Sequence, residues 1–296
     1  MSGSSTRWVA AATCLIGFVG VMAPVPEAMA STAPTSAKAL SAVTVSYGSD
    51  PLQTIDIYPG RAPNAKVVIM IPGSGWRSGI NMNMEVMAAR NLQSDGYAVF
   101  DMSFRGDSSS APAFPMETDD VRAATAYAAA HAATYNADAA KVILLGGSSG
   151  AQLAAYATLQ MNTASHHFVS LVVTLSGPSD FPTLIAYWNA RTGPDAALHL
   201  GNQLDALGCQ SASTCPTALE NQWSADRQVT PANCPANWLV FNSSAEEMPV
   251  QQADAMTAAL KAAGCKVTES ILGGNKHGFH SFKSLESQID AGINAA

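Results

Sequence analysis

The sequence predicts an α/β fold in which helices cover both faces of a mostly parallel central sheet. Short runs rich in β-branched residues alternate with Ala-rich helical stretches from residue 42 to residue 296. The strand-like runs are apolar at nearly every position, which is typical of strands buried on both faces. No repeat or long linker interrupts the alternation. These three observations favour a single domain of the layered α/β class.

The first half of this region contains a hairpin, two buried strands and a helix. Residues 43–47 and 54–58 are expected to pair as an antiparallel hairpin, because the turn-forming sequence Gly-Ser-Asp-Pro connects them. The apolar runs at 66–71 and 97–103 are expected to be buried strands. A helix is expected over 119–134, whose first two residues are carboxylates that suit a helix N-terminus.

The second half continues the same alternation. Further strands are expected at residues 141–145, 169–176, 237–242 and 266–272. Further helices are expected at residues 151–161, 249–263 and 282–291. Between about 177 and 236 the apolar pattern is weak, and Gly, Pro, Asn and three cysteines are common. We expect a loop-rich lid or substrate-side insertion there.

The composition supports one folded domain and argues against two classes of partner. Of the 296 residues, 48% are hydrophobic and 12% are charged, so a large core is easily built. The net charge is −7, and the 15 Lys and Arg residues are scattered singly. We therefore expect neither a nucleic acid nor an anionic membrane as partner. No feature of the sequence specifies an oligomeric state.

The N-terminus has the three-part layout of a secretory signal. Arg7 supplies a positive charge, residues 8–23 are almost wholly apolar, and Ala28-Met29-Ala30 is a small-residue cleavage pattern. We expect a signal peptide at 1–30, a disordered spacer at 31–41, and a secreted domain at 42–296. A retained membrane anchor is the alternative, but the apolar run is shorter than the ~20 residues that a bilayer requires.

Four cysteines remain after the predicted signal: Cys209, Cys215, Cys234 and Cys265. An even number in an exported chain favours two disulfides. Of the three possible pairings we favour Cys209 with Cys215, which closes a small local loop and leaves Cys234 for Cys265. Free buried thiols are the alternative. A zinc site is disfavoured because the sequence has no CxxC pair and no nearby His cluster.

The most informative motif is Gly146-Gly147-Ser148-Ser149-Gly150, between a predicted strand and an Ala-rich helix. This GxSxG spacing in this context is typical of a nucleophile elbow, in which flanking glycines allow a sharp turn that exposes the central serine. Ser148 occupies the central position, and Ser149 is the rival nucleophile. The N-terminus of the following helix and the backbone N–H of Ser149 are suited to stabilise a developing oxyanion.

A serine needs a base held by an acid before it becomes a strong nucleophile. Beyond the last predicted strand, the only histidines are His277 and His280. His277 lies on a Gly-rich loop directly after that strand, and we predict that it is the base. His280 is expected to have a structural or surface role. A second small-residue turn, Pro72-Gly73-Ser74-Gly75-Trp76, follows an early strand and lets backbone N–H groups approach a substrate oxygen.

Taken together, these segments resemble bacterial esterases of the α/β-hydrolase superfamily that are related to hormone-sensitive lipase and to acetyl and feruloyl esterases. In those proteins an early strand ends in His-Gly-Gly-Gly-Trp, the elbow reads Gly-x-Ser-Ala-Gly-Gly, and the base lies in His-Gly-Phe. The resemblance covers roughly residues 43–290. It implies the α/β-hydrolase fold, no metal or organic cofactor, and the N–H groups of Ser74 and Gly75 as further oxyanion donors. Pro72 and Ser74 depart from the family pattern, since a histidine and a glycine normally occupy these two positions.

The triad acid is the third departure. In the resembling esterases the acid is commonly an Asp four residues before the Pro that opens the next helix, and here that position is Ala245. Glu246 and Glu247 are adjacent substitutes, each one methylene longer than Asp. We predict Glu246 as the acid. Glu247 is the alternative, because a carboxylate nearer the helix start is also explained by the helix dipole. A distant acid such as Asp180 is the third possibility.

The resemblance and the motifs together predict a secreted serine esterase. Ser148 would attack a carboxylic ester, with His277 as base and Glu246 as acid. The ester would be one of a short acyl group, or an acetylated or feruloylated carbohydrate. A small-molecule or carbohydrate ester is the expected partner, with no stable membrane anchor. A peptidase or amidase on the same fold, and a non-catalytic binding protein that retains the scaffold, are the alternatives.

Overall fold

The computed structural model describes residues 41–77, 83–107, 112–234 and 237–296. The predicted signal peptide at 1–30, and all but the last residue of the predicted spacer at 31–41, therefore lie outside the described residues. Within the described ranges, no helix is long and apolar enough to span a membrane.

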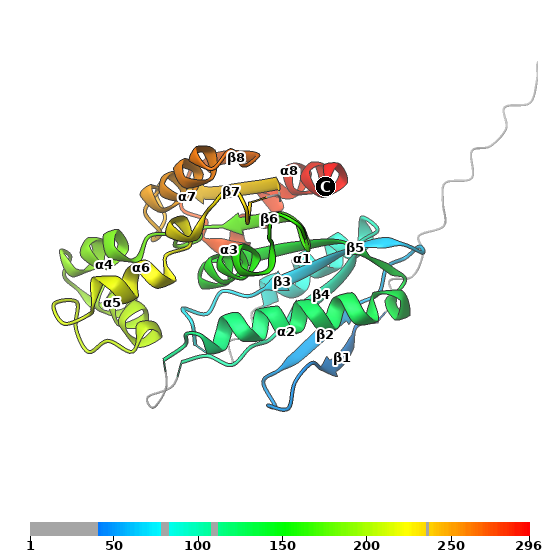
Figure 1. The fold of residues 1–296 in the computed structure, drawn as a ribbon, viewed down its shortest axis with the longest axis horizontal. Coiled ribbons are helices and arrows are strands. Elements are labelled where there is room, and N and C mark those ends of the chain that lie inside the picture. Colours follow the sequence, from blue (N-terminus) through cyan, green and yellow to red (C-terminus); the bar gives the residue numbers. More distant parts are fainter. Residues whose placement is uncertain (1–40, 78–82, 108–111, 235–236) are drawn as a thin grey trace, which may run out of the picture. The chain divides into compact units, whose positions relative to one another are not determined.

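In the described part of the chain, eight strands form one sheet in the order β1-β2-β4-β3-β5-β6-β7-β8, from the bottom to the top of Figure 1. The strands are β1 (Val43–Ser46), β2 (Thr54–Tyr58), β3 (Ala65–Ile71), β4 (Ala98–Met102), β5 (Ala137–Gly147), β6 (Val169–Leu175), β7 (Asn237–Ser243) and β8 (Val267–Leu272). The β1–β2 and β2–β4 pairs are antiparallel, and every other pair is parallel. The predicted α/β-hydrolase fold class, with a mostly parallel sheet, is confirmed.

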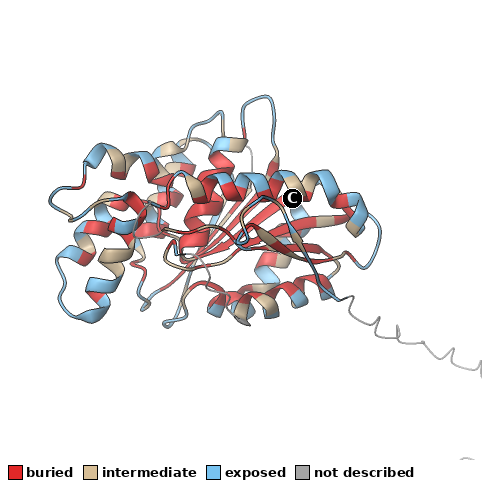
Figure 2. Ribbon diagram, turned by 90° about the horizontal axis from the view of Figure 1, so that it is seen from below, coloured by how far each residue is buried: buried red, intermediate tan, exposed pale blue. Residues whose placement is uncertain are grey.

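Helices cover both faces of the sheet. One face carries α1 (Asn83–Ser94) and α8 (Phe282–Ala295), and the other carries α2 (Met116–His131), α3 (Ser149–Met161) and α7 (Gln251–Ala262). The short 3-10 helix η1 (Ala132–Tyr135) extends α2, and a second one, η3 (Gly278–Ser281), precedes α8. Buried residues concentrate between these layers (Figure 2).

Strand β3 shows why the strand-like runs are continuously apolar. Val67 and Ile69 pack on the α2–α3–α7 side, whereas Val68 and Met70 pack on the α1–α8 side. All four side chains are fully buried. Alternate residues of a strand point to opposite faces, so a strand covered on both faces must be apolar at every position.

Helix α1 was not predicted from the sequence. Its buried face contains Ala88, Ala89 and Leu92, but also the polar residues Glu85 and Gln93. Those two polar side chains break the apolar period of a helix that packs against the sheet.

The segment between β6 and β7 is more helical than its composition suggested. It contains α4 (Phe181–Asn189), α5 (Pro194–Leu207), α6 (Thr217–Trp223) and η2 (Ala225–Gln228), and α4 to α6 lie beyond the carboxyl ends of the parallel strands (Figure 1). Helix α5 opens with a proline in its first turn and ends at Gly208, which has a φ of 71°. The Gly and Pro residues that indicated loops are thus the start and stop signals of short helices.

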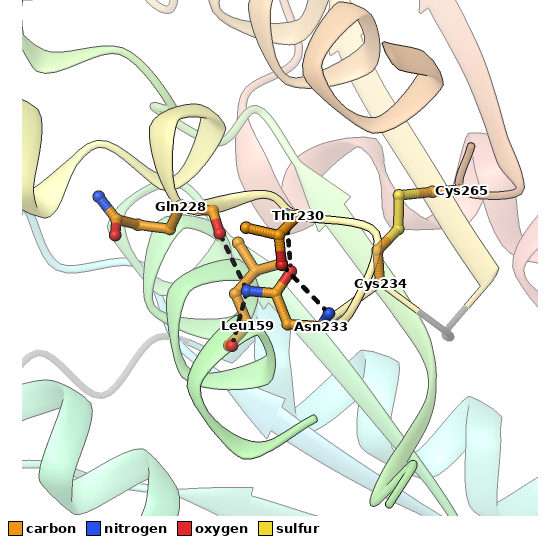
Figure 3. Close-up of a disulfide and its surroundings, with 6 residues drawn as sticks. All are labelled: Leu159, Gln228, Thr230, Asn233, Cys234 and Cys265. Carbon is orange, nitrogen blue, oxygen red and sulfur yellow. Dashed lines mark hydrogen bonds between the residues drawn. A yellow bond between two sulfur atoms is a disulfide. The ribbon is translucent and has the colours of Figure 1, made fainter. Parts of the chain in front are cut away.

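Two disulfides join Cys209 to Cys215 and Cys234 to Cys265, which is the pairing that the spacing favoured. The second ties the segment before β7 to the residues before β8 (Figure 3). Beside it, the side-chain amide of Asn233 donates to the carbonyls of Leu159 (3.0 Å) and Gln228 (2.9 Å). This segment is therefore held both to the neighbouring strand and to the end of α3.

We expect the two disulfides to differ in their contribution to stability. The cysteines are 6 residues apart in one and 31 in the other. Because loop-closure entropy grows with the logarithm of loop length, replacing Cys234 and Cys265 with Ala should lower the free energy of unfolding by about 4 kcal/mol, against about 2 kcal/mol for Cys209 and Cys215. Urea denaturation of the two double variants measures both losses. Equal losses, or the reverse order, would contradict the loop-length argument.

Candidate active site

Ser148 lies on a sharp turn between β5 and α3. Its backbone has a φ of 53° and a ψ of −126°, and its N–H donates to the carbonyl of Leu175 at 2.8 Å. A Cβ on Gly146 would lie 2.2 Å from the carbonyl oxygen of Gly150, and one on Gly150 would lie 2.3 Å from that of Ile71. Only glycine fits at either flank, so the GxSxG spacing is a requirement of this turn.

The loop after β3 packs directly on this elbow. A Cβ on Gly73 would lie 2.8 Å from the carbonyl oxygen of Gly147. The N–H of Ser74 donates to Oγ of Ser149 at 3.0 Å, which differs from its expected role as an oxyanion donor. Within the described residues, no hydrogen bond engages the N–H of Gly75, which has a φ of 64°. Ser149 is the first residue of α3, so its N–H has no hydrogen-bond partner within the helix.

His277 and Glu246 form a direct contact between the loops after β8 and β7. Nδ1 of His277 hydrogen-bonds Oε2 of Glu246. The Glu246 side chain is fully buried, and its other oxygen accepts from the N–H of Ser243 at 2.7 Å and the hydroxyl of Ser176 at 2.8 Å. A carboxylate held by several donors has a fixed orientation, so the imidazole that it contacts is also held in place.

Ser176 is a site residue that the sequence analysis missed. It follows β6, has a φ of 57°, and its Oγ accepts from the N–H of Gly278 at 3.0 Å while it donates to Glu246. It therefore links the carboxylate to the backbone beside His277. A single serine at the end of a strand belongs to no sequence motif that would predict a role in the site. Its role is evident only from its contacts in the folded structure.

The two rival acids occupy different positions. Glu247 approaches the other ring nitrogen of His277, with Oε1 at 3.1 Å from Nε2, and its side chain is 45% exposed. Asp180 caps α4 through the N–H of Thr183 and pairs with Arg227 at 3.0 Å, away from His277. Of the three candidates, Glu246 is the buried carboxylate on Nδ1.

A pocket of about 760 Å³ joins these groups. Ser148, His277 and Gly75 line it on the sheet side. On the opposite side its lining comes from α5, whose residues at positions i, i+3, i+4 and i+7 of one helical face are Asp195, Leu198, His199 and Asn202. The insertion between β6 and β7 therefore roofs the pocket. No group of three His, Cys, Asp or Glu side chains among the described residues is arranged to hold a metal ion.

The site residues come from five strands that are consecutive in the sheet. The loops after β3, β5, β6, β7 and β8 carry Gly75, Ser148, Ser176, Glu246 and His277 respectively. Parallel pairing brings the carboxyl ends of these strands to one edge, which is where open α/β sheets bind ligands.

Glu85 of α1 also reaches this pocket, with only 1% of its surface exposed. Burial raises the pKa of its carboxyl to about 7, and the backbone N–H groups of Glu85 and Gly73 partly oppose this shift. The charged form is therefore disfavoured in the folded protein.

We expect Glu85→Gln to stabilise the protein at alkaline but not at acidic pH. Between about pH 4.5 and 7 the folded state holds a proton that the unfolded state has lost, so the free energy of unfolding falls as pH rises. Above pH 7 the full free-energy cost of ionising Glu85 in the folded state remains, about 3 kcal/mol. Urea denaturation should show that gain for Glu85→Gln at pH 8 and none at pH 4.5. A gain independent of pH would refute the assignment of the cost to ionisation.

Comparison with known proteins shows the family and the fold of the chain. The BD-FAE family model matches residues 55–259, well over half of the chain. No curated protein sequence matches the chain. Many solved structures share the fold, and three of them illustrate its range.

A truncated carbohydrate esterase from gut microbiota is 22% identical, with 88% of this chain and 98% of that chain covered and a TM-score of 0.69. Esterase B from Lactobacillus rhamnosis is 19% identical, with 86% of each chain covered and a TM-score of 0.69. An acetyl ester-xyloside bifunctional hydrolase from Caldicellulosiruptor lactoaceticus is 16% identical, with 88% and 96% covered and a TM-score of 0.64. At these identities the likeness establishes the fold, and the matched model establishes the family: the chain belongs to the BD-FAE family.

Proposed function

We propose that the protein is a secreted serine esterase that hydrolyses carboxylic esters through an acyl-enzyme on Ser148. One observation carries the proposal. The strained serine lies in the same pocket as His277, whose Nδ1 is held by the fully buried carboxylate of Glu246. A serine, an imidazole and an orienting carboxylate are the groups that acyl transfer requires.

In the proposed reaction Ser148 Oγ attacks the ester carbonyl while Nε2 of His277 takes its proton. The N–H groups of Gly75 and Ser149 stabilise the oxyanion, and the Ser74 N–H braces the elbow through Ser149 Oγ. The imidazolium then protonates the leaving alcohol, and water hydrolyses the acyl-enzyme by the same route. Glu246 stabilises the imidazolium in both steps.

The substrates that we propose are esters of short acyl groups or acetylated or feruloylated carbohydrates. The solved relatives include a carbohydrate esterase and an acetyl ester-xyloside hydrolase, which supports this class. The pocket, at about 760 Å³, has room for an acyl group together with a sugar-sized alcohol. The two disulfides agree with the proposed secretion, because disulfides persist in oxidising compartments.

Covalent labelling tests the proposal most directly. A fluorophosphonate probe should label the folded protein at Ser148, and the protein should release p-nitrophenol from short-chain esters and acetate from acetylated sugars. Folded protein that resists labelling and hydrolyses none of these esters would instead support a binding protein on a retained scaffold.

Glu246→Gln should lower kcat by about 10²–10⁴, because it removes the charge that stabilises the imidazolium. Glu247→Gln, the matched variant one residue away, should change kcat by less than tenfold. Steady-state kinetics of the two variants on one p-nitrophenyl ester decide between the glutamates. A severe loss in Glu247→Gln with a near-normal Glu246→Gln reverses the assignment, and two near-normal variants exclude both.

A further inference from the structure

Adjacent glutamates in the loop after β7 contact different ring nitrogens of His277. The side chain of Glu246 is fully buried against Nδ1 of His277, whereas the side chain of Glu247 is 45% exposed and lines the pocket that contains Ser148. The Glu247 carboxylate lies between two histidines, with Oε1 3.1 Å from Nε2 of His277 and Oε2 3.6 Å from Nε2 of His199 on α5. The proposed reaction assigns no task to this carboxylate.

The contact of Glu247 with His277 is incompatible with catalysis. Nε2 is the atom that must take the proton of Ser148, yet here it faces a carboxylate, and no hydrogen bond joins it to Ser148 Oγ among the described residues. Oε1 of Glu247 occupies the space beside Nε2, so the carboxylate must move away before Nε2 can accept the proton of Ser148.

The place of Glu247 also identifies the part of the substrate that it meets. Nε2 of His277 delivers a proton to the leaving oxygen, so the alcohol part of the ester lies beside Nε2. A carboxylate 3.1 Å from that nitrogen is next to the same alcohol. An ionised carboxylate is an acceptor only, and a hydroxyl group on the alcohol is the donor that can replace the imidazole.

The geometry points to Glu247 as the residue that selects hydroxyl-bearing alcohols. In such an alcohol the hydroxyl is on the carbon adjacent to the one that bears the ester oxygen, and it donates a hydrogen bond to Glu247. The carboxylate then leaves His277 for this hydroxyl, and Nε2 is free to act as the base. An ester that lacks such a hydroxyl leaves Glu247 on Nε2. This inference rests on the proposed esterase function and adds to it the polyol monoester as the preferred substrate.

Two acetates of nearly equal size test this selection. Ethylene glycol monoacetate carries a terminal hydroxyl where propyl acetate carries a methyl group. The wild-type protein should prefer the glycol ester about tenfold or more in kcat/KM, as expected for a charge-assisted hydrogen bond in a partly exposed pocket. Glu247→Ala should bring the ratio close to one, and Glu247→Gln should fall between the two.

If Glu247 blocks the base, its removal should raise kcat/KM for the substrate that lacks the hydroxyl. In Glu247→Ala the kcat/KM for propyl acetate should increase, because nothing then competes for Nε2, while the value for the glycol ester falls. A simple loss of structure would lower both. Asp195→Asn is the control, since Asp195 lines the same pocket on α5 but is not paired with His277; this variant should keep the wild-type ratio.

The outcomes separate the two proposals. Folded wild-type protein that hydrolyses neither acetate nor any p-nitrophenyl ester would overturn the esterase function, and this inference with it. Hydrolysis of both acetates with a ratio that Glu247→Ala leaves unchanged would overturn only the role of Glu247. An equal loss of the ratio in Asp195→Asn would assign the preference to pocket charge in general and would also overturn it.

Discussion

Ser148→Ala is expected to lower kcat by three to six orders of magnitude while the protein remains folded. The hydroxyl is the proposed attacking group, and groups that act as a unit lose almost their whole effect when one is removed. Ala also removes no packing, because Ser148 faces the pocket rather than the core. Steady-state kinetics on a p-nitrophenyl ester, with a thermal melt as the folding check, measure both expectations.

Ser149→Ala is the matched control for the nucleophile. It removes the acceptor of the Ser74 N–H, a neutral hydrogen bond whose loss should lower kcat by about tenfold or less. Loss of fluorophosphonate labelling in Ser149→Ala, with labelling retained in Ser148→Ala, would show that the wrong serine was chosen.

His277→Ala should fall in the same range of three to six orders of magnitude. In the proposed reaction the imidazole both takes the proton of Ser148 and returns it to the leaving alcohol, so its removal takes away the general base and the general acid together. Glu246 would also lose its partner on Nδ1, so its charge would no longer serve the reaction. The same esterase assay measures this loss.

His280→Ala distinguishes the base from its neighbour. His280 lies three residues further along the chain, within η3, and lines the pocket as well. Its replacement should change kcat by no more than about tenfold. A dead His280→Ala variant beside an active His277→Ala variant would transfer the role of base to His280.

The strands and the flanking helices could be predicted because local chemistry determines them. A strand such as β3 is buried on both faces and must be apolar throughout, and the elbow at Ser148 requires its glycines. Helix α1 could not be predicted, because its buried face contains Glu85, a residue that lines the pocket and interrupts the apolar pattern of the helix. The apolar period fails where the tertiary environment accepts a polar side chain.

The site was predictable where a motif carries its own turn and not where it depends on contacts between loops. Ser148 and His277 follow strands in Gly-rich segments, and the structure brings both into one pocket. The burial of Glu246 and the exposure of Glu247 depend on how one loop bends, which the sequence of the two residues does not encode. The place of Ser176 in the site depends on the order of the strands in the sheet. The contribution of α5 to the pocket depends on how the insertion between β6 and β7 folds.

The position of β8 affects the order in which activity is lost. Among the described strands β8 has β7 as its single neighbour and is therefore an edge strand, and the loop that follows it carries His277. Local opening of an edge requires less free energy than global unfolding. Activity should therefore disappear at a urea concentration below the midpoint of tryptophan fluorescence, and on refolding it should return after the central sheet has formed.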